Sequence, residues 1–342
     1  MTFSLNKIVR PSILALQPYS SARDEFSGTE GIFIDANENP FGELNRYPDP
    51  YQKELKAKIG EVKNVAKEHV FVGNGSDEII DLLFRIFCEP GRDKVAALNP
   101  SYGMYEVSAA LNNVGLVHIP LNDDFQIDIS TAVELLKDAS IKLLFLCSPN
   151  NPTGNTVGGL ETLLQNFSGL VVVDEAYIDF STRPSFIHKL AQYPNLVVLQ
   201  TLSKAWGLAA ARIGMAFADR GLIGLLNKVK PPYNVSLLNQ QAALNALNHL
   251  DLFEGNKKII LEQRNYLSSE LSLIPQVVHV YPSDANFLLV KTTDADGIYQ
   301  FLTAQKIIVR NRNKVAPGCL RITVGTENEN KKLIAALQNY QA

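Results

Sequence analysis

Short, fully apolar runs alternate with longer amphipathic segments between residues 70 and 218. A run that is apolar throughout predicts a strand buried on both faces of a sheet, with helices covering each side. The predicted strands are 70–72, 94–98, 114–119, 141–147, 170–173, 196–200 and 213–218. The predicted helices between them are 77–88, 102–112, 131–138, 159–166 and 187–193. This order predicts an α/β domain with a mostly parallel, seven-stranded sheet between helical layers.

The pattern changes after residue 235, where a long helical stretch at 237–273, broken near Gly255, begins. Strands and helices then follow in the order of a small α+β domain. Its predicted elements are strands 277–281, 287–290, 307–310 and 320–324, a helix at 298–305 and a terminal helix from Asn328. Nearer the start, a short strand is expected at 32–35 and a helix at 54–59.

We therefore expect three parts in this chain. Residues 1–30 are polar and irregular, and we expect an N-terminal arm that packs near the small domain and the substrate site. Residues 31–235 form the predicted large domain, and residues 236–342 form the predicted small one. Ligands of such sheets bind beyond the carboxyl ends of the strands, so the site is expected there.

The composition narrows the class of protein. Of 342 residues, 46% are apolar and 20% charged, and the net charge of −3 offers no basic field for nucleic acid. No run of about 18 apolar residues predicts a membrane span, and the first ten residues lack a signal core, so we expect a cytoplasmic protein. The cysteines and histidines lack ligand spacing; we expect no metal, and buried free thiols at Cys88, Cys147 and Cys319.

The most informative segment follows the predicted strand at 196–200. Lys204 lies between the hydroxyl residues Thr201 and Ser203 on one side and Arg212 on the other. Hydroxyl groups and an arginine suit a phosphate group. A lysine beside a phosphate site is what a pyridoxal 5′-phosphate (PLP) enzyme needs, because its amine forms a Schiff base with the cofactor aldehyde.

A second candidate phosphate contact follows the predicted strand at 70–72. Gly75, Ser76 and Asp77 stand at the start of an apolar helix, whose first N–H groups have no partner within the helix. These amides, with glycine allowing close approach, suit an anion. The alternative is a simple turn in which Ser76 caps the helix.

Three further strand ends carry residues that suit an aromatic cofactor. Asp174 directly follows a buried strand and needs a partner, such as a protonated pyridine nitrogen; the alternative is a helix cap. Tyr177 is near enough in sequence to reach the same ring. Asn151 has an amide suited to a phenolic oxygen. Tyr102 is suited to stacking on the ring, with core packing as the alternative.

Together these motifs resemble those of the fold-type I PLP-dependent aminotransferases. The resemblance runs essentially from end to end and is strongest to the histidinol-phosphate aminotransferase family. It implies that family's fold, with a large PLP-binding domain and a small C-terminal domain. The motifs that carry it are 73–78, 148–154, 174–177 and 203–204, with the more specific segments 16–19, 37–40, 46–48, 88–91, 308–310 and 318–325.

The resemblance implies a role for each cofactor residue. Lys204 would bind the cofactor covalently and move the proton, Asp174 would pair with the pyridine nitrogen, Tyr102 would stack on the ring, and Asn151 and Tyr177 would hydrogen-bond its phenolic oxygen. The residues implied to hold the cofactor phosphate are Gly75, Ser76, Thr201, Ser203 and Arg212.

The resemblance also concerns Asp77 and Tyr47. Asp77 matches the family motif at 73–78, although a role in the loop and at the start of the helix would also explain an aspartate there. Tyr47 is implied to reach the phosphate of the other subunit's cofactor, which would make the active unit a two-fold homodimer.

The resemblance also implies the substrate contacts Arg310, Arg321, Tyr19 and Asn286. Arginine suits this role because its planar fork binds phosphate or carboxylate through two hydrogen bonds. A surface salt bridge is the alternative for Arg310. Arg321 lies inside an apolar strand and has the greater need of an anion.

The implied reaction is transamination between L-histidinol phosphate and 2-oxoglutarate, which gives imidazole acetol phosphate and glutamate in histidine biosynthesis. An aromatic-amino-acid transaminase and a threonine-phosphate decarboxylase stay open as alternatives, because both keep Lys204. A non-catalytic PLP-binding regulator is disfavoured, because about 30 residues before the first strand leave no room for a DNA-binding domain. A nucleotide-binding protein is disfavoured because its glycine-rich motifs are absent.

Overall fold

The computed structural model describes residues 3–19 and 31–340. Its centre is a seven-stranded sheet in the order β1-β7-β6-β5-β4-β2-β3. Strand β7 runs antiparallel to both of its neighbours, and the other pairs are parallel. The strands are β1 (Val70–Asn74), β2 (Lys94–Asn99), β3 (Gly115–Pro120), β4 (Ile141–Cys147), β5 (Leu170–Asp174), β6 (Leu196–Thr201) and β7 (Ile213–Ala218). The predicted mostly parallel sheet is confirmed.

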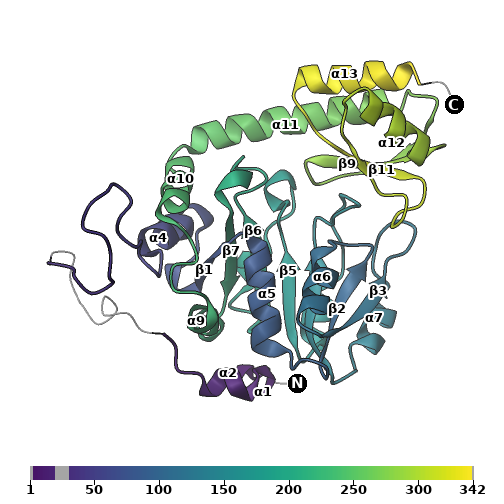
Figure 1. Cartoon of the computed structure of the whole chain (residues 1–342). Coiled ribbons are helices and arrows are strands. Elements are labelled where there is room, and N and C mark those ends of the chain that lie inside the picture. Colours follow the sequence, from purple (N-terminus) through teal and green to yellow (C-terminus); the bar gives the residue numbers. More distant parts are fainter. Residues whose placement is uncertain (1–2, 20–30, 341–342) are drawn as a thin grey trace.

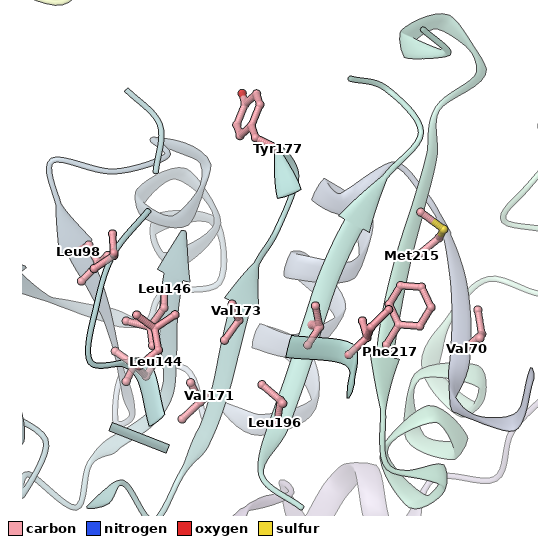
Figure 2. Packing of buried hydrophobic residues seen from close by; sticks show 14 of the residues in the cluster. Val70, Leu98, Leu144, Leu146, Val171, Val173, Tyr177, Leu196, Met215 and Phe217 are labelled. Atoms are coloured by element: carbon pink, nitrogen blue, oxygen red, sulfur yellow. The ribbon is translucent and has the colours of Figure 1, made fainter. Parts of the chain in front are cut away.

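Helices cover both faces of this sheet (Figure 1). The α-helices of this part are α4 (Lys53–Lys63), α5 (Ser76–Phe87), α6 (Met104–Leu111), α7 (Ile129–Leu135), α8 (Leu160–Asn166) and α9 (Arg220–Val229). Two apolar cores result, one on each side of the sheet. Successive strand residues point to opposite faces, so Val171 and Val173 belong to one core and Leu170 and Val172 to the other. Figure 2 shows the first core along one face of the sheet, with Tyr177 beyond the end of β5.

A second sheet, in the order β10-β11-β9-β8, lies beyond one end of the first (Figure 1). All its pairs are antiparallel, and its helices share a third core with it. Its strands are β8 (Val277–Val280), β9 (Phe287–Thr292), β10 (Arg310–Asn311) and β11 (Cys319–Thr323), and its helices are α11 (Leu250–Leu271), α12 (Ala295–Ala304) and α13 (Glu327–Gln338). The predicted small α+β part is confirmed.

Helix α10 (Leu237–Leu247) connects the two parts. Its residues Ala243 and Leu247 are buried in a core of the large sheet. The predicted boundary at residue 235 stays a prediction, and this packing assigns α10 to the large-sheet side.

The N-terminal arm differs from its prediction. It contains two short helices, α1 (Leu5–Ile8) and α2 (Pro11–Ala15), where an irregular segment was expected. It also packs on the large domain: Val9 is buried in a core there, Arg10 forms a 3.0 Å ion pair with Glu89, and Lys228 Nζ donates to the carbonyl of Leu14 over 2.9 Å. The expected packing of the arm near the small domain and the substrate site stays a prediction; residues 20–30 lie outside the described part.

Four predicted elements also differ. Residues 32–35 form no strand: Ile32 and Ile34 are 93% and 90% exposed, and no strand of residues 3–19 or 31–340 pairs with them. The helix at 187–193 is reduced to a 3₁₀ turn at Phe186–Lys189. The helical break falls at residues 248–249, and Gly255 lies inside α11, where an added Cβ would meet nothing within 4 Å. The strand at 307–310 shrinks to Arg310–Asn311.

Three smaller findings concern the described residues. Cys88, Cys147 and Cys319 are free and buried, as predicted. Among residues 3–19 and 31–340, no three His, Cys, Asp or Glu side chains are grouped as metal ligands. No helix in that part combines the length and apolar character needed to cross a bilayer.

Candidate active site

A cavity of about 330 Å³ lies beyond the carboxyl ends of β4, β5 and β6, and residues of the small domain line its far side. Its position agrees with the rule for ligand sites in parallel sheets. The cavity is lined by Ser76, Asp77, Tyr102, Cys147, Asn151, Asp174, Ala176, Tyr177, Thr201, Ser203, Lys204, Arg212, Arg310, Arg312 and Arg321.

One end of the cavity is built as a cradle for a phosphate group. Gly75 has a φ of +79°, and a Cβ there would lie 2.4 Å from Arg212 Nη2, so only glycine fits. A Cβ on Gly214 of β7 would lie 2.3 Å from the Ser76 nitrogen, so two glycines hold this peptide close to the sheet. The start of α5, the hydroxyl residues Thr201 and Ser203 and the guanidinium of Arg212 line the same cavity. Backbone amides, hydroxyl groups and a cation together suit a dianion.

Asp77 links the cradle to the aromatic wall of the cavity. Its Oδ2 lies 3.4 Å from Arg212 Nη2, and its Oδ1 accepts a 3.0 Å hydrogen bond from the Tyr102 hydroxyl. Burial, followed by the charge of Asp77, raises the pKa of Tyr102 and keeps its phenol protonated. Asp77 therefore orients both neighbours.

Asp174 is a buried carboxylate that forms no ion pair within residues 3–19 and 31–340. Its Oδ2 accepts a 2.7 Å hydrogen bond from the Tyr105 hydroxyl, and its Oδ1 accepts from the backbone N–H of Ala176 over 3.1 Å. Burial raises the pKa of Asp174, and the two hydrogen bonds only partly offset that rise. A protonated ring nitrogen would supply the missing positive charge.

The side chain of Lys204 lines the cavity. Its Nζ lies 5.6 Å from the centre of the Tyr177 ring. Partial burial of its amine, followed by the nearby charge of Arg321, lowers the pKa of Lys204. A lowered pKa leaves more of the amine unprotonated at neutral pH, as a nucleophile and general base requires.

Asn151 connects the ring site to the small domain. Its Nδ2 donates to the Tyr177 hydroxyl over 3.4 Å, and its Oδ1 accepts from Arg321 Nη1 over 2.5 Å. The Arg321 guanidinium also lies 5.2 Å from the centre of the Phe287 ring. A substrate anion bound at Arg321 would therefore be linked to Tyr177 through the hydrogen bonds of Asn151.

Most of the predicted site residues are brought together in this cavity. Those that line it are Ser76, Asp77, Tyr102, Asn151, Asp174, Tyr177, Thr201, Ser203, Lys204, Arg212, Arg310 and Arg321. Gly75 stands directly beside it, against Arg212.

Three predicted contacts lie outside this cavity. Tyr19 is 72% exposed. Tyr47 stacks on Tyr233 with 4.4 Å between ring centres and lines a different hollow. The backbone carbonyl of Asn286 accepts from the Val324 N–H over 2.9 Å, and the residue does not line the cavity. Their predicted roles stay predictions.

Sequence reasoning missed Arg312, Tyr105, Cys147 and Ala176. Tyr105 reads as a core residue, and it is buried, so no local pattern marks its contact with Asp174. Arg312 follows Arg310 by two residues, and side chains two apart on an extended chain point to the same face. This spacing could have placed Arg312 beside Arg310 in the site.

The comparisons with known proteins agree with this geometry. The sequence pattern of the family "Aminotransferase class I and II" matches residues 31–337. A histidinol-phosphate aminotransferase of Bacteroides fragilis is 53% identical over 99% of both chains, and one of Cytophaga hutchinsonii is 51% identical over 99% of this chain and 100% of its own. A solved histidinol-phosphate aminotransferase from Sinorhizobium meliloti, in complex with PLP, superimposes with a TM-score of 0.78 at 25% identity, covering 86% of this chain and 83% of its own.

The fold and the site define a PLP-dependent enzyme of the aminotransferase type. The chain belongs to the class I and II aminotransferases. The residues present fit the family's cofactor, since a glycine-built cradle, a buried carboxylate whose pKa is raised and a lysine of lowered pKa share one cavity.

Proposed function

We propose that this enzyme transfers the amino group of L-histidinol phosphate to 2-oxoglutarate, giving imidazole acetol phosphate and glutamate, a step of histidine biosynthesis. The observation that carries the proposal is the convergence of Lys204 with Arg310 and Arg321 in one cavity. The relatives that are about half identical over nearly the whole chain bear the name of this activity.

The cofactor residues would act as follows. The backbone at Gly75 and Ser76, together with Thr201, Ser203 and Arg212, would hold the phosphate of PLP. Asp174 would pair with the ring nitrogen, and Tyr102 would lie against the ring. Asn151 and Tyr177 would donate hydrogen bonds to the phenolic oxygen. PLP, when bound, supplies an aldehyde that carries the amino group and a ring that accepts electrons.

Lys204 would be the proton carrier. Its Nζ would remove the proton from the substrate carbon that bears nitrogen. The lowered pKa favours the unprotonated amine that this step needs.

The arginines of the small domain would bind the substrate anion. The same site must take the phosphate of histidinol phosphate in one half-reaction and a carboxylate of glutamate in the other. Arg321 suits both, because its fork can grip either group and its Nε is buried without a hydrogen-bond partner in the described part of the chain. Tyr19 and Asn286 would add contacts when substrate is bound.

The active unit would be a homodimer in the cytoplasm. Residues 31–47 extend away from the body of the chain near α4 (Figure 1) and carry the exposed side chains of Ile32, Ile34 and Phe41. Exposed apolar groups on an extended segment suit burial against a second copy. Packing of residues 31–47 against a second copy would bring Tyr47 to the cofactor phosphate of the other subunit.

Glutamate production tests the proposed reaction. The purified holoenzyme is incubated with 2-oxoglutarate and either L-histidinol phosphate, phenylalanine, tyrosine or threonine phosphate, and glutamate and carbon dioxide are measured. We expect glutamate to form fastest with histidinol phosphate. Faster turnover of an aromatic amino acid would favour the aromatic transaminase, and carbon dioxide release from threonine phosphate would favour the decarboxylase.

A further inference from the structure

Arg312 is a third small-domain arginine that lines the cavity, and the roles above leave it unused. Arg310 lies directly opposite Arg321 in the β10–β11 pair, so both side chains belong to the same face of the small sheet. Arg312 follows Arg310 by two residues and, by the alternation of an extended chain, takes the same face. All three line the cavity that contains Lys204.

The backbone of Arg312 is fixed on both sides. Its N–H donates to the Cys319 carbonyl over 3.0 Å, and its carbonyl accepts from the N–H groups of Val315 and Ala316 over 2.9 and 2.8 Å. The side chain therefore starts from a closed turn in a defined place. This limits the backbone entropy that a bound ligand would have to remove.

The side chain is half-buried and lacks a partner. Arg312 Nε is buried and makes no hydrogen bond, and within residues 3–19 and 31–340 no carboxylate pairs with Arg310, Arg312 or Arg321. Burial, followed by the charges of Arg321 and Arg310, lowers the pKa of Arg312. Three like charges on one face repel one another, so the arrangement is unfavourable until an anion arrives.

The number of arginines indicates the kind of anion. A carboxylate has one negative charge and two oxygens, which a single arginine fork can satisfy. A phosphate monoester has up to two negative charges and three terminal oxygens near neutral pH, so it can use more than one arginine. Arg321 already donates one of its N–H groups to Asn151.

We propose that Arg312 binds the phosphate of the amine substrate and sets the preference for a phosphorylated donor over glutamate. This inference rests on the proposed function, because it assumes that the donor is a phosphate monoester. It assigns Arg321 to both substrates and Arg312 mainly to the phosphorylated one.

The experiment compares Arg312→Gln, Arg312→Lys and the control Lys314→Gln. Lys314 belongs to the same turn but is exposed and lies outside the cavity, so its replacement removes the same charge without removing a ligand contact. The apparent KM and maximal rate of the half-reaction, followed as loss of the visible PLP band, are measured for each holoenzyme with histidinol phosphate or glutamate as the only substrate, so that the amino group passes to the bound cofactor and no keto acid is needed. The visible absorbance of bound PLP and the thermal midpoint establish that each variant is folded and loaded.

Arg312→Gln is expected to raise KM for histidinol phosphate at least about tenfold and KM for glutamate less than about threefold, as expected for losing a hydrogen bond to a charged group. Arg312→Lys should restore part of the loss, because it keeps the charge but not the fork, and Lys314→Gln should match wild type. Equal changes for both donors, or no change, would overturn the proposal.

A second measurement separates this inference from the proposed function. Inorganic phosphate is tested as a competitive inhibitor against glutamate in the wild type and in Arg312→Gln. If the wild type ignores histidinol phosphate but phosphate inhibition weakens at least about tenfold in the variant, the proposed reaction fails and the Arg312 site stands. If inhibition is the same in both proteins, the Arg312 site is wrong.

Discussion

The hydroxyl of Tyr105 donates a 2.7 Å hydrogen bond to Oδ2 of Asp174, and both side chains are buried. The Tyr105 ring is itself held by stacking on Phe145, with 4.7 Å between ring centres. A core residue of one helix therefore fixes the carboxylate proposed to pair with the cofactor ring. We infer that Tyr105 is a positioning residue, which acts through Asp174.

Tyr105→Phe is expected to lower kcat on the order of tenfold. A hydrogen bond to a charged group contributes about 1.5–3 kcal/mol, and its loss raises the pKa of Asp174 further. Because activity needs the ionised carboxylate, the acid limb of the pH–kcat profile should move to higher pH. Phenylalanine keeps the stacking on Phe145, so the fold should persist. An unchanged profile would leave Tyr105 a purely structural residue.

Asp174→Asn is expected to stabilise the apoprotein at neutral pH while removing activity. The pKa of Asp174 in the folded protein is raised above its ordinary value of 3.8. The charge of this carboxylate therefore costs no stability below pH 3.8, and the free energy of unfolding falls as the pH rises from there through the folded pKa. Thermal midpoints of both apoproteins, measured at neutral and acid pH, should differ at neutral pH and converge in acid. Added PLP should stabilise the wild type more than the variant. A variant less stable than wild-type apoprotein at neutral pH would contradict this account.

Gly214→Ala is expected to weaken PLP binding on the order of tenfold or more. Its Cβ would lie 2.3 Å from the Gly75 carbonyl carbon and the Ser76 nitrogen, so the peptide of the phosphate cradle must move. Gly255→Ala is the matched control, because its Cβ meets nothing within 4 Å and it lies on an exposed helix face. Titration of each apoprotein with PLP gives the two affinities. Equal PLP affinities of the two variants would show that the peptide between Gly75 and Ser76 does not bind the cofactor phosphate.

Arg321→Ala is expected to raise KM for both histidinol phosphate and glutamate, on the order of 10- to 100-fold. The substitution removes the fork that would bind either anion, together with the 2.5 Å hydrogen bond to Asn151. Steady-state kinetics with each donor measure the effect. An unchanged KM for both would take Arg321 out of the site.

Strong local patterns made most of the large sheet predictable. Apolar runs such as 141–147 and 213–218 coincide with strands that are buried almost throughout. Since strand ends gather at one edge of a parallel sheet, residues directly after them, such as Asp174 and Lys204, could be placed in one site before the structure was known.

The features that sequence could not supply depend on neighbours distant in the chain. Ile32 and Ile34 have the residue types of a strand, but none of the strands in the described part of the chain pairs with them. Gly255 interrupts the helical pattern, yet a single exposed glycine costs a helix only about 1 kcal/mol, so α11 continues through it. Tyr105 becomes part of the site only because its buried hydroxyl meets Asp174 across the core.

The most direct test of the central claim is the absorbance spectrum of the purified enzyme before and after addition of L-histidinol phosphate without a keto acid. The wild type should show the visible band of bound PLP, lose it to the aminated cofactor, and regain it with 2-oxoglutarate. Lys204→Ala should bind PLP through the phosphate cradle and show almost no turnover. A wild type that shows no visible band when supplied with PLP, or a Lys204→Ala enzyme with near wild-type turnover, would contradict the account.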